Sequence, residues 1–143
     1  MRAEEFVEYA FVEYEEHGPI TVGRVLATSV LDAANVSQFG TQVLRYVQER
    51  SGMNLLLDFT GVGYLSSAVL TELIRIQHAH SNTKGSLRLC ALNKDIRKVF
   101  AITNLDQVFV IDDIGVGESI KRFQRSLKVA KEDNTWLGLR KGV

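Results

Sequence analysis

This sequence has almost no cysteine, no long apolar run and no signal-peptide pattern. Cys90 is its single cysteine, so no disulfide can form within the chain, and this count is typical of a reducing compartment. No apolar run approaches the roughly 18 residues that a membrane span needs. The first ten residues, MRAEEFVEYA, lack the basic and then apolar order of a signal peptide. The sequence therefore predicts a cytoplasmic protein without a membrane segment.

The chain also lacks an excess of charge of either sign. Its 17 basic residues balance 17 acidic ones, and the arginines are spread along the chain, so no basic field favours nucleic acid or an anionic membrane. What it has is apolar residues, 45% of the 143. That fraction is ample for one buried core in a chain of this size.

Strand-like and helix-like patterns alternate along the chain. β-Branched and aromatic residues around Gly18-Pro19 predict a hairpin of two strands. The run MNLLLDF at 53–59 is continuously apolar, as expected of a strand covered on both faces. Further strands are predicted at 86–92 and 107–112, and apolar spacings of three and four residues predict helices at 32–52, 66–80, 93–105 and 116–130.

This order predicts an α/β fold with a mixed β-sheet, in which strands alternate with helices that lie mainly on one face. We expect a single domain over residues 1–127. Residues 128–143 are polar apart from Trp136 and a few aliphatic residues, and are predicted to form a partly flexible C-terminal extension.

Two adjacent hydroxyls, Ser66 and Ser67, lie between the strand at 53–59 and the helix that follows it. A serine at this position can cap the helix by accepting a hydrogen bond from a free backbone N–H group. It can also carry a phosphate, because a helix N-terminus favours an anion and the added charge changes any surface docked there. The residues alone leave both interpretations open.

The junction resembles a known signature. The chain reads DFTGVGYLSSAVL from Asp58 to Leu70, and this is similar to the pattern D-[LF]-x-x-V-x-x-[ML]-D-S-[ST]-G-L of STAS domains, in particular bacterial anti-sigma factor antagonists. The later segments KGSLRLCAL and NKDIRKVFAITNLDQVFVIDD continue the resemblance, which covers roughly residues 6 to 127. It implies a STAS-like fold.

Matched position by position, Ser67 takes the place of the family's phosphorylated serine. Leu65 takes the apolar position, and Ala68 the second Ser/Thr. The chain departs from the pattern at Ser66, which replaces the motif aspartate, and at Val69, which replaces the glycine.

The resemblance implies a function by partner switching. The unmodified protein would bind a serine kinase that is also an anti-sigma factor, and phosphorylation of Ser67 would release it. We expect no enzymatic activity and no cofactor. The predicted partner-binding surface consists of Asp58, Gly63, Tyr64, Leu65, Ser66, Ser67 and Ala68.

Two alternatives remain beside this hypothesis. One is a STAS scaffold that is not phosphorylated and assembles with copies of itself or with other signalling domains. The other is a small-ligand or nucleotide-binding domain, which would rest on the strand-end Asp58 and the helix start at Ser66.

Other polar residues are predicted to be structural. His78 and His80 are two residues apart on a helix, so they point in different directions and are expected to be surface histidines rather than metal ligands. Cys90 lies within an apolar strand, where a buried inert thiol is expected. Asp112 and Asp113 follow a strand and, with Asp58, suggest a carboxylate cluster, although turn formation is the commoner role of such residues.

Overall fold

The computed structural model describes residues 11–26 and 35–141, with side chains up to residue 129. These residues form a five-stranded sheet in the order β1-β2-β3-β4-β5. The first two strands pair antiparallel, and all the others pair parallel. The predicted mixed sheet is confirmed, and its strands are β1 (Val12–His17), β2 (Ile20–Val25), β3 (Asn54–Asp58), β4 (Leu87–Cys90) and β5 (Val110–Asp112).

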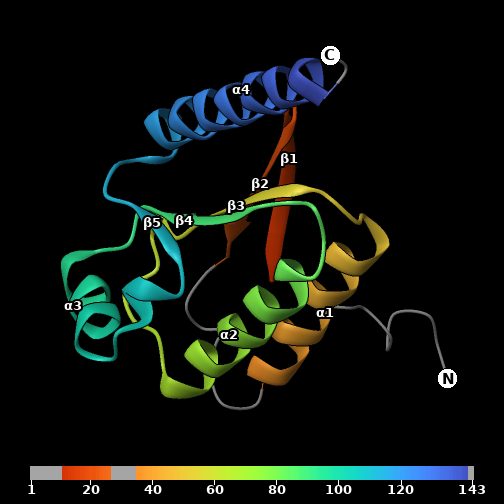
Figure 1. The fold of residues 1–143 in the computed structure, drawn as a ribbon. Coiled ribbons are helices and arrows are strands. Elements are labelled where there is room, and N and C mark those ends of the chain that lie inside the picture. The colour runs from red at the N-terminus through yellow and green to blue at the C-terminus, as the bar shows by residue number, and fades with distance from the viewer. Residues whose placement is uncertain (1–10, 27–34, 142–143) are drawn as a thin grey trace, which may run out of the picture.

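Four α-helices cover this sheet (Figure 1). They are α1 (Val36–Glu49), α2 (Ser67–Ser81), α3 (Lys94–Ile102) and α4 (Val116–Lys141), and a short 3-10 helix, η3 (Leu105–Gln107), precedes β5. Residues of α1, α2 and α3 share one large apolar cluster beneath the sheet, whereas α4 lies on the opposite face. The prediction that the helices lie mainly on one face is confirmed.

The central strand β3 shows why its sequence is continuously apolar. Leu55 and Leu57 belong to the cluster that contains α1 and α2, and Leu56 belongs to the smaller cluster beneath α4. Successive side chains of a strand point to opposite faces, so a strand covered on both faces needs apolar residues at every position. On the α4 side, Phe123 is fully buried and anchors the helix to the sheet.

The structure differs from the predicted elements mainly at their ends. The sequence pattern extends the two hairpin strands over residues 6–17 and 20–28, and it offers Asp32 or Asn35 as the cap of the next helix. Residues 6–10, 27, 28 and 32 lie outside the described part of the chain. Asn35 occupies the N-cap position of α1 without a side-chain cap hydrogen bond. The last strand was predicted to begin at Gln107, but Leu105–Gln107 form η3 and β5 begins at Val110. Ile74, which the apolar spacing of α2 places on the inward face, is 40% exposed, and Ile102 at the end of α3 is 80% exposed.

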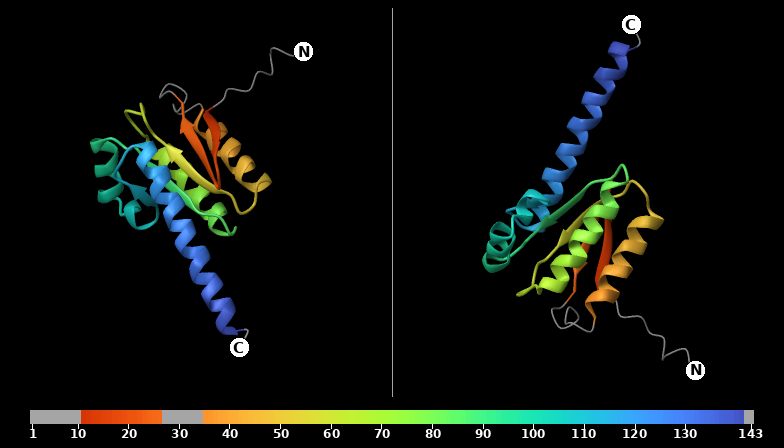
Figure 2. Two further views of the ribbon diagram at one scale, coloured as in Figure 1. Left: turned by 90° about the horizontal axis from the view of Figure 1, so that it is seen from above. Right: turned by 60° about the horizontal axis from the view of Figure 1, so that its bottom comes forward.

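Helix α4 continues past the sheet (Figure 2). It runs without a break to Lys141, so the predicted division between the domain and its extension, at residues 127 and 128, falls inside the helix. That division stays a prediction.

The prediction that His80 lies on the surface is wrong. His80 is buried near the end of α2, beside the backbone of Met53 and Ser86, whereas His78 is exposed. Burial lowers the pKa of the His80 imidazole below its ordinary value of 6.5, against a smaller opposing effect of these backbone groups. The imidazole is therefore neutral in the folded chain at pH 7.

This burial predicts a pH-dependent stability. Because the pKa of His80 is lower in the folded chain than in the unfolded chain, the unfolded chain binds more proton at His80 as the pH drops through 6.5, and the free energy of unfolding falls. Urea denaturation at several pH values between about 7 and 5 measures this fall. His80→Gln is expected to make the curve flatter and His78→Gln to leave it unchanged. Equal curves for the two variants would contradict the assignment to His80.

Candidate functional site

The serine pair lies where the chain leaves β3 and enters α2. Ser66 is the N-cap residue, with extended backbone angles of φ −78° and ψ 164°, and its Oγ accepts a hydrogen bond from the Val69 N–H at 3.3 Å. The first N–H groups of a helix have no partner within the helix, so this contact satisfies one of them. The capping interpretation therefore applies to Ser66.

Ser67 has a different environment although it is the next residue. It is the first residue of α2 and is exposed, and its carbonyl oxygen accepts a hydrogen bond from Thr71 Oγ1 at 3.0 Å. Its own hydroxyl has no hydrogen-bond partner among the described residues. The Ser67 hydroxyl therefore faces solvent at the positive end of the helix macrodipole.

This division of roles predicts different effects for two neighbouring substitutions. Ser66→Ala is expected to lower the free energy of unfolding by about 1 kcal/mol, because the Val69 N–H loses its acceptor. Ser67→Ala is expected to change it by less than about 0.5 kcal/mol. Urea denaturation of both variants tests this, and a larger loss for Ser67→Ala would show that the cap is assigned to the wrong serine.

The structure exposes only part of the predicted contact surface. Tyr64 is 72% exposed, and Gly63 and Ala68 are exposed beside Ser67. Leu65, in contrast, is buried and belongs to the core cluster.

Asp58 was predicted to belong to the contact surface, but its side chain is only 4% exposed. Its Oδ1 accepts hydrogen bonds from the N–H of Thr60 at 2.9 Å and from Thr60 Oγ1 at 2.6 Å. This contact fixes the turn after β3, as short polar side chains often do. Asp58 is therefore buried and positions the loop that precedes Ser67.

Sequence reasoning missed the role of α3 beside this loop. Asn93 caps α3 through its Oδ1, which accepts from the Ile96 N–H at 2.8 Å. Its Nδ2 donates to the carbonyl oxygens of Val62 and Gly63, at 3.3 and 3.1 Å. One side chain thus ties the loop that precedes Ser67 to a helix some thirty residues further along the chain.

The loop and α3 enclose a small hollow of about 70 Å³, lined by Gly63, Tyr64, Leu65, Leu70, Asp95, Ile96 and Val99. Tyr64 and Val99 line the hollow. Ile74 lies four residues after the lining residue Leu70 on α2, and Ile102 lies three residues after Val99 on α3, so each is a neighbour on the same helix surface. We call these four partly or largely exposed apolar residues the α2–α3 face: Tyr64, Ile74, Val99 and Ile102. The sequence does contain a signal for this face: α2 and α3 have more apolar residues than the one side of each helix that faces the core can bury. Exposed apolar residues grouped in this way are typical of protein contact sites.

The structure does not bring the three aspartates of the suggested carboxylate cluster together as a functional site. Asp112 is buried, accepts a hydrogen bond from Ser119 Oγ at 2.5 Å, and pairs with Arg88 and Arg122 at 3.1 and 3.5 Å. Asp113 points elsewhere and pairs with Arg97. Within the described part of the chain, no three His, Cys, Asp or Glu residues are grouped so that they could hold a metal ion.

Cys90 is buried, as predicted, and lies between Asp58 and Asp112 in the strand register. Burial, together with these two carboxylates, raises the pKa of its thiol to about 12. The thiol is therefore protonated at neutral pH and is a poor nucleophile.

Known proteins share the sequence pattern and the fold of this chain. The profile of the STAS domain family matches residues 12–126. The chain belongs to the STAS domain family. In residues 11–26 and 35–141, no helix is both long and apolar enough to cross a membrane.

Solved STAS structures have the same architecture. An anti-sigma-factor antagonist (STAS) domain protein from Planctomyces limnophilus superimposes with a TM-score of 0.69, at 19% identity over 80% of this chain and 99% of that one. The Bacillus cell fate determinant SpoIIAA in its phosphorylated form gives 0.61, at 18% identity over 78% and 97%. A chain of the stressosome, a signal integration and transduction hub, gives 0.65, at 15% identity over 80% and 98%. At identities this low, the structural similarity shows a common fold and nothing more.

Proposed function

We propose that this STAS domain is an anti-sigma factor antagonist that acts by partner switching in the cytoplasm, with Ser67 as its phosphorylation site. The observation that carries the proposal is the division of the serine pair: Ser66 makes the cap hydrogen bond, while Ser67 is exposed beside it. Phosphate can therefore be added to Ser67 without breaking the helix cap.

The chain itself is proposed to be a substrate and a binding partner rather than an enzyme. A serine kinase of the anti-sigma type would bind the α2–α3 face and Ser67 while the hydroxyl is free. The Ser67 Oγ would attack the γ-phosphorus of the kinase-bound ATP and lose its proton, and ADP would leave. The product carries about −1.5 to −2 charge at the edge of an apolar contact, where desolvating it is unfavourable. The kinase would then be released.

The two departures from the family pattern are compatible with this proposal. Val69 replaces the motif glycine, but its side chain is fully buried and belongs to the core cluster, so it points away from a docked partner. Ser66 replaces the motif aspartate and still supplies a capping oxygen. The change removes one negative charge beside Ser67, which lowers the repulsion of an incoming phosphate.

Binding to the kinase is tested with the unmodified chain. Each serine kinase of the anti-sigma type from the source organism is mixed with a sigma factor that it holds, and the chain is then added. We expect the chain to bind one of these kinases and to displace the sigma factor, as seen by size-exclusion chromatography. A matched variant, Ile102→Asp, should bind that kinase more weakly, because it places a charge on the α2–α3 face. If no kinase binds the chain, the proposal is wrong.

A second candidate function is a STAS scaffold that is not switched at Ser67. The fold shared with a stressosome chain and the length of α4 support it. Light scattering distinguishes the two functions. A stable oligomer that is unchanged by Ser67→Glu would favour the scaffold, and a monomer would count against it.

The ligand-binding alternative has weaker support. The two features on which it rests already have partners within the chain, because Asp58 accepts from Thr60 and Ser66 accepts from Val69. Titration calorimetry with common nucleotides is expected to give no heat of binding.

A further inference from the structure

The outer edge of β1 is open in the described part of the chain. The carbonyl oxygen of Phe11 accepts from the Leu26 N–H, and Val12 lies opposite Val25. In an antiparallel pair the hydrogen-bonded positions alternate, so every second residue of β1 bonds to β2 and the others do not. The backbone N–H and C=O groups of Val12, Tyr14 and Glu16 therefore point away from β2, toward the open edge.

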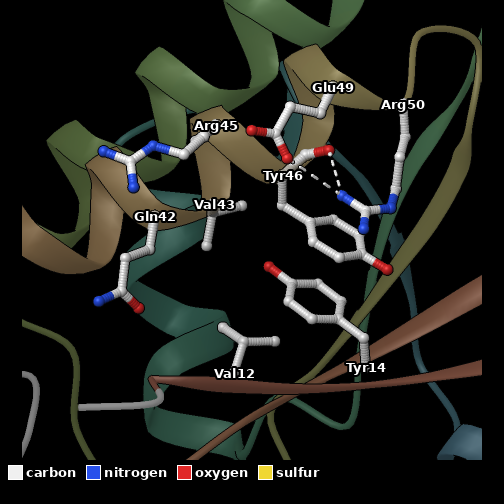
Figure 3. A pocket seen from close by; sticks show the side chains of 8 residues that line it. All are labelled: Val12, Tyr14, Gln42, Val43, Arg45, Tyr46, Glu49 and Arg50. Atoms are coloured by element: carbon white, nitrogen blue, oxygen red, sulfur yellow. Dashed lines mark hydrogen bonds and ion pairs between the residues drawn. The ribbon is translucent and has the colours of Figure 1, made fainter. Parts of the chain in front are cut away.

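Helix α1 flanks this edge and forms a groove with it (Figure 3). The groove has a volume of about 240 Å³ and is lined by Val12, Tyr14, Gln42, Val43, Arg45, Tyr46, Glu49 and Arg50. The rings of Tyr14 and Tyr46 stack at a centroid distance of 3.6 Å, and the guanidinium of Arg50 lies 3.8 Å from the centroid of the Tyr46 ring. Stacked aromatic rings between an edge strand and a helix give the groove a firm apolar wall.

The opposite face of β1 is acidic. Glu13, Glu15 and His17 line a second hollow, of about 600 Å³, together with residues of β2, β3 and α4. Glu13 pairs with Arg24, whereas Glu15 is 78% exposed and, among the described residues, pairs only with His17, at 3.4 Å. The six residues of β1, VEYEEH, include three glutamates and no lysine or arginine.

We propose that this edge binds an extended basic segment of a partner protein, which adds to the sheet as a strand beside β1. Main-chain hydrogen bonds would form with Val12, Tyr14 and Glu16. Alternate side chains of the segment would be lysine or arginine, facing Glu13 and Glu15, and the side chains between them would be apolar, entering the groove beside α1. Strand addition of this kind takes affinity from the main chain and specificity from the alternate pockets.

The charge on β1 determines the choice of occupant. A second copy of this chain would bring three more glutamates against the three already there, and like charges on facing strands are destabilising. A basic segment meets the opposite sign, which favours its approach and its register. The acidic edge therefore disfavours self-pairing and favours a basic partner.

The test uses the full chain and a labelled peptide, Lys-Val-Lys-Phe-Lys-Val, with binding followed by fluorescence anisotropy. N-methylation of one alternate set of peptide nitrogens should weaken binding at least tenfold, and methylation of the other set less than twofold, because only one set faces β1. The shuffled peptide Lys-Lys-Lys-Val-Phe-Val should bind at least fivefold more weakly. Equal effects of the two methylated sets, or equal binding of the shuffled peptide, would overturn strand addition.

Variants of the protein locate the site. Glu15→Lys should weaken binding about tenfold, and Asp106→Lys, which makes the same charge change on η3, should not. Glu16→Pro removes an outward N–H and should weaken binding more than Glu16→Gln. Ser67→Glu should leave peptide binding unchanged, so the result does not depend on the proposed partner switch. An equal loss for Glu15→Lys and Asp106→Lys would overturn the proposal, as would a dimer of this chain that Glu15→Lys dissociates.

Discussion

Ser67→Glu is expected to weaken binding to the serine-kinase anti-sigma factor about 100-fold, which corresponds to roughly 2.7 kcal/mol. The substitution places a negative charge next to the exposed apolar α2–α3 face, where a docked partner would remove it from water. Folding is not the cause of this loss. A carboxylate in the first turn of a helix is stabilising by about 0.3–1 kcal/mol, so the melting temperature should stay the same or rise.

Ser67→Gln is the matched control, because it has nearly the same size as the glutamate variant and no charge. It should bind the kinase within about fivefold of the unmodified chain, a difference of roughly 1 kcal/mol. Isothermal titration calorimetry measures both affinities. If Ser67→Glu binds as tightly as Ser67→Gln, charge at this position does not control the interface.

Asp112→Ala is expected to lower the free energy of unfolding by about 3–5 kcal/mol. The Asp112 carboxylate is buried between β5 and α4, where it accepts from Ser119 and pairs with Arg88. Its removal leaves the Arg88 guanidinium, whose side chain is only 16% exposed, without its buried counter-charge. It also leaves the fully buried Ser119 hydroxyl without an acceptor. Both losses weaken the attachment of α4 to the sheet.

The neighbouring Asp113→Ala provides the control. Asp113 is exposed and pairs with Arg97 at the surface, and exposed ion pairs contribute about 0–1 kcal/mol. Urea denaturation of both variants at pH 7 gives the comparison. Similar losses for Asp112→Ala and Asp113→Ala would mean that the buried network does not hold α4 in place.

The fold followed closely from sequence patterns because most of its elements have strong periodicity. The continuous apolar run of β3 indicated a strand covered on both faces, and both faces are covered. Residues at the margins of the core were harder to predict. Ile74 lies four residues after the buried Leu70 in the apolar spacing of α2, but it lies beside the buried side of the helix and is 40% exposed.

Polar residues were predicted less well because their surroundings come from distant parts of the chain. His80 is buried by the backbone near Met53 and Ser86, which no helical pattern within α2 reveals. Asp58 was assigned to the contact surface from its place in the motif, but the parity of β3 turns it toward the α4 side of the sheet.

The serine pair shows the same limit at the candidate site itself. The residues allowed both capping and phosphorylation at either position. Only the backbone geometry at the start of α2 gives the cap to Ser66 and leaves Ser67 exposed. The hydrogen bonds from Asn93 to the carbonyl oxygens of Val62 and Gly63 join segments about thirty residues apart, so no local pattern predicts them.

The most direct test of the partner switch is to locate the phosphate. The chain is incubated with ATP and each serine kinase of the anti-sigma type, and the modified residue is identified by mass spectrometry. We expect phosphate on Ser67, and none on the Ser67→Ala chain. Phosphate on another residue, or none with any of these kinases, would contradict the switch at Ser67.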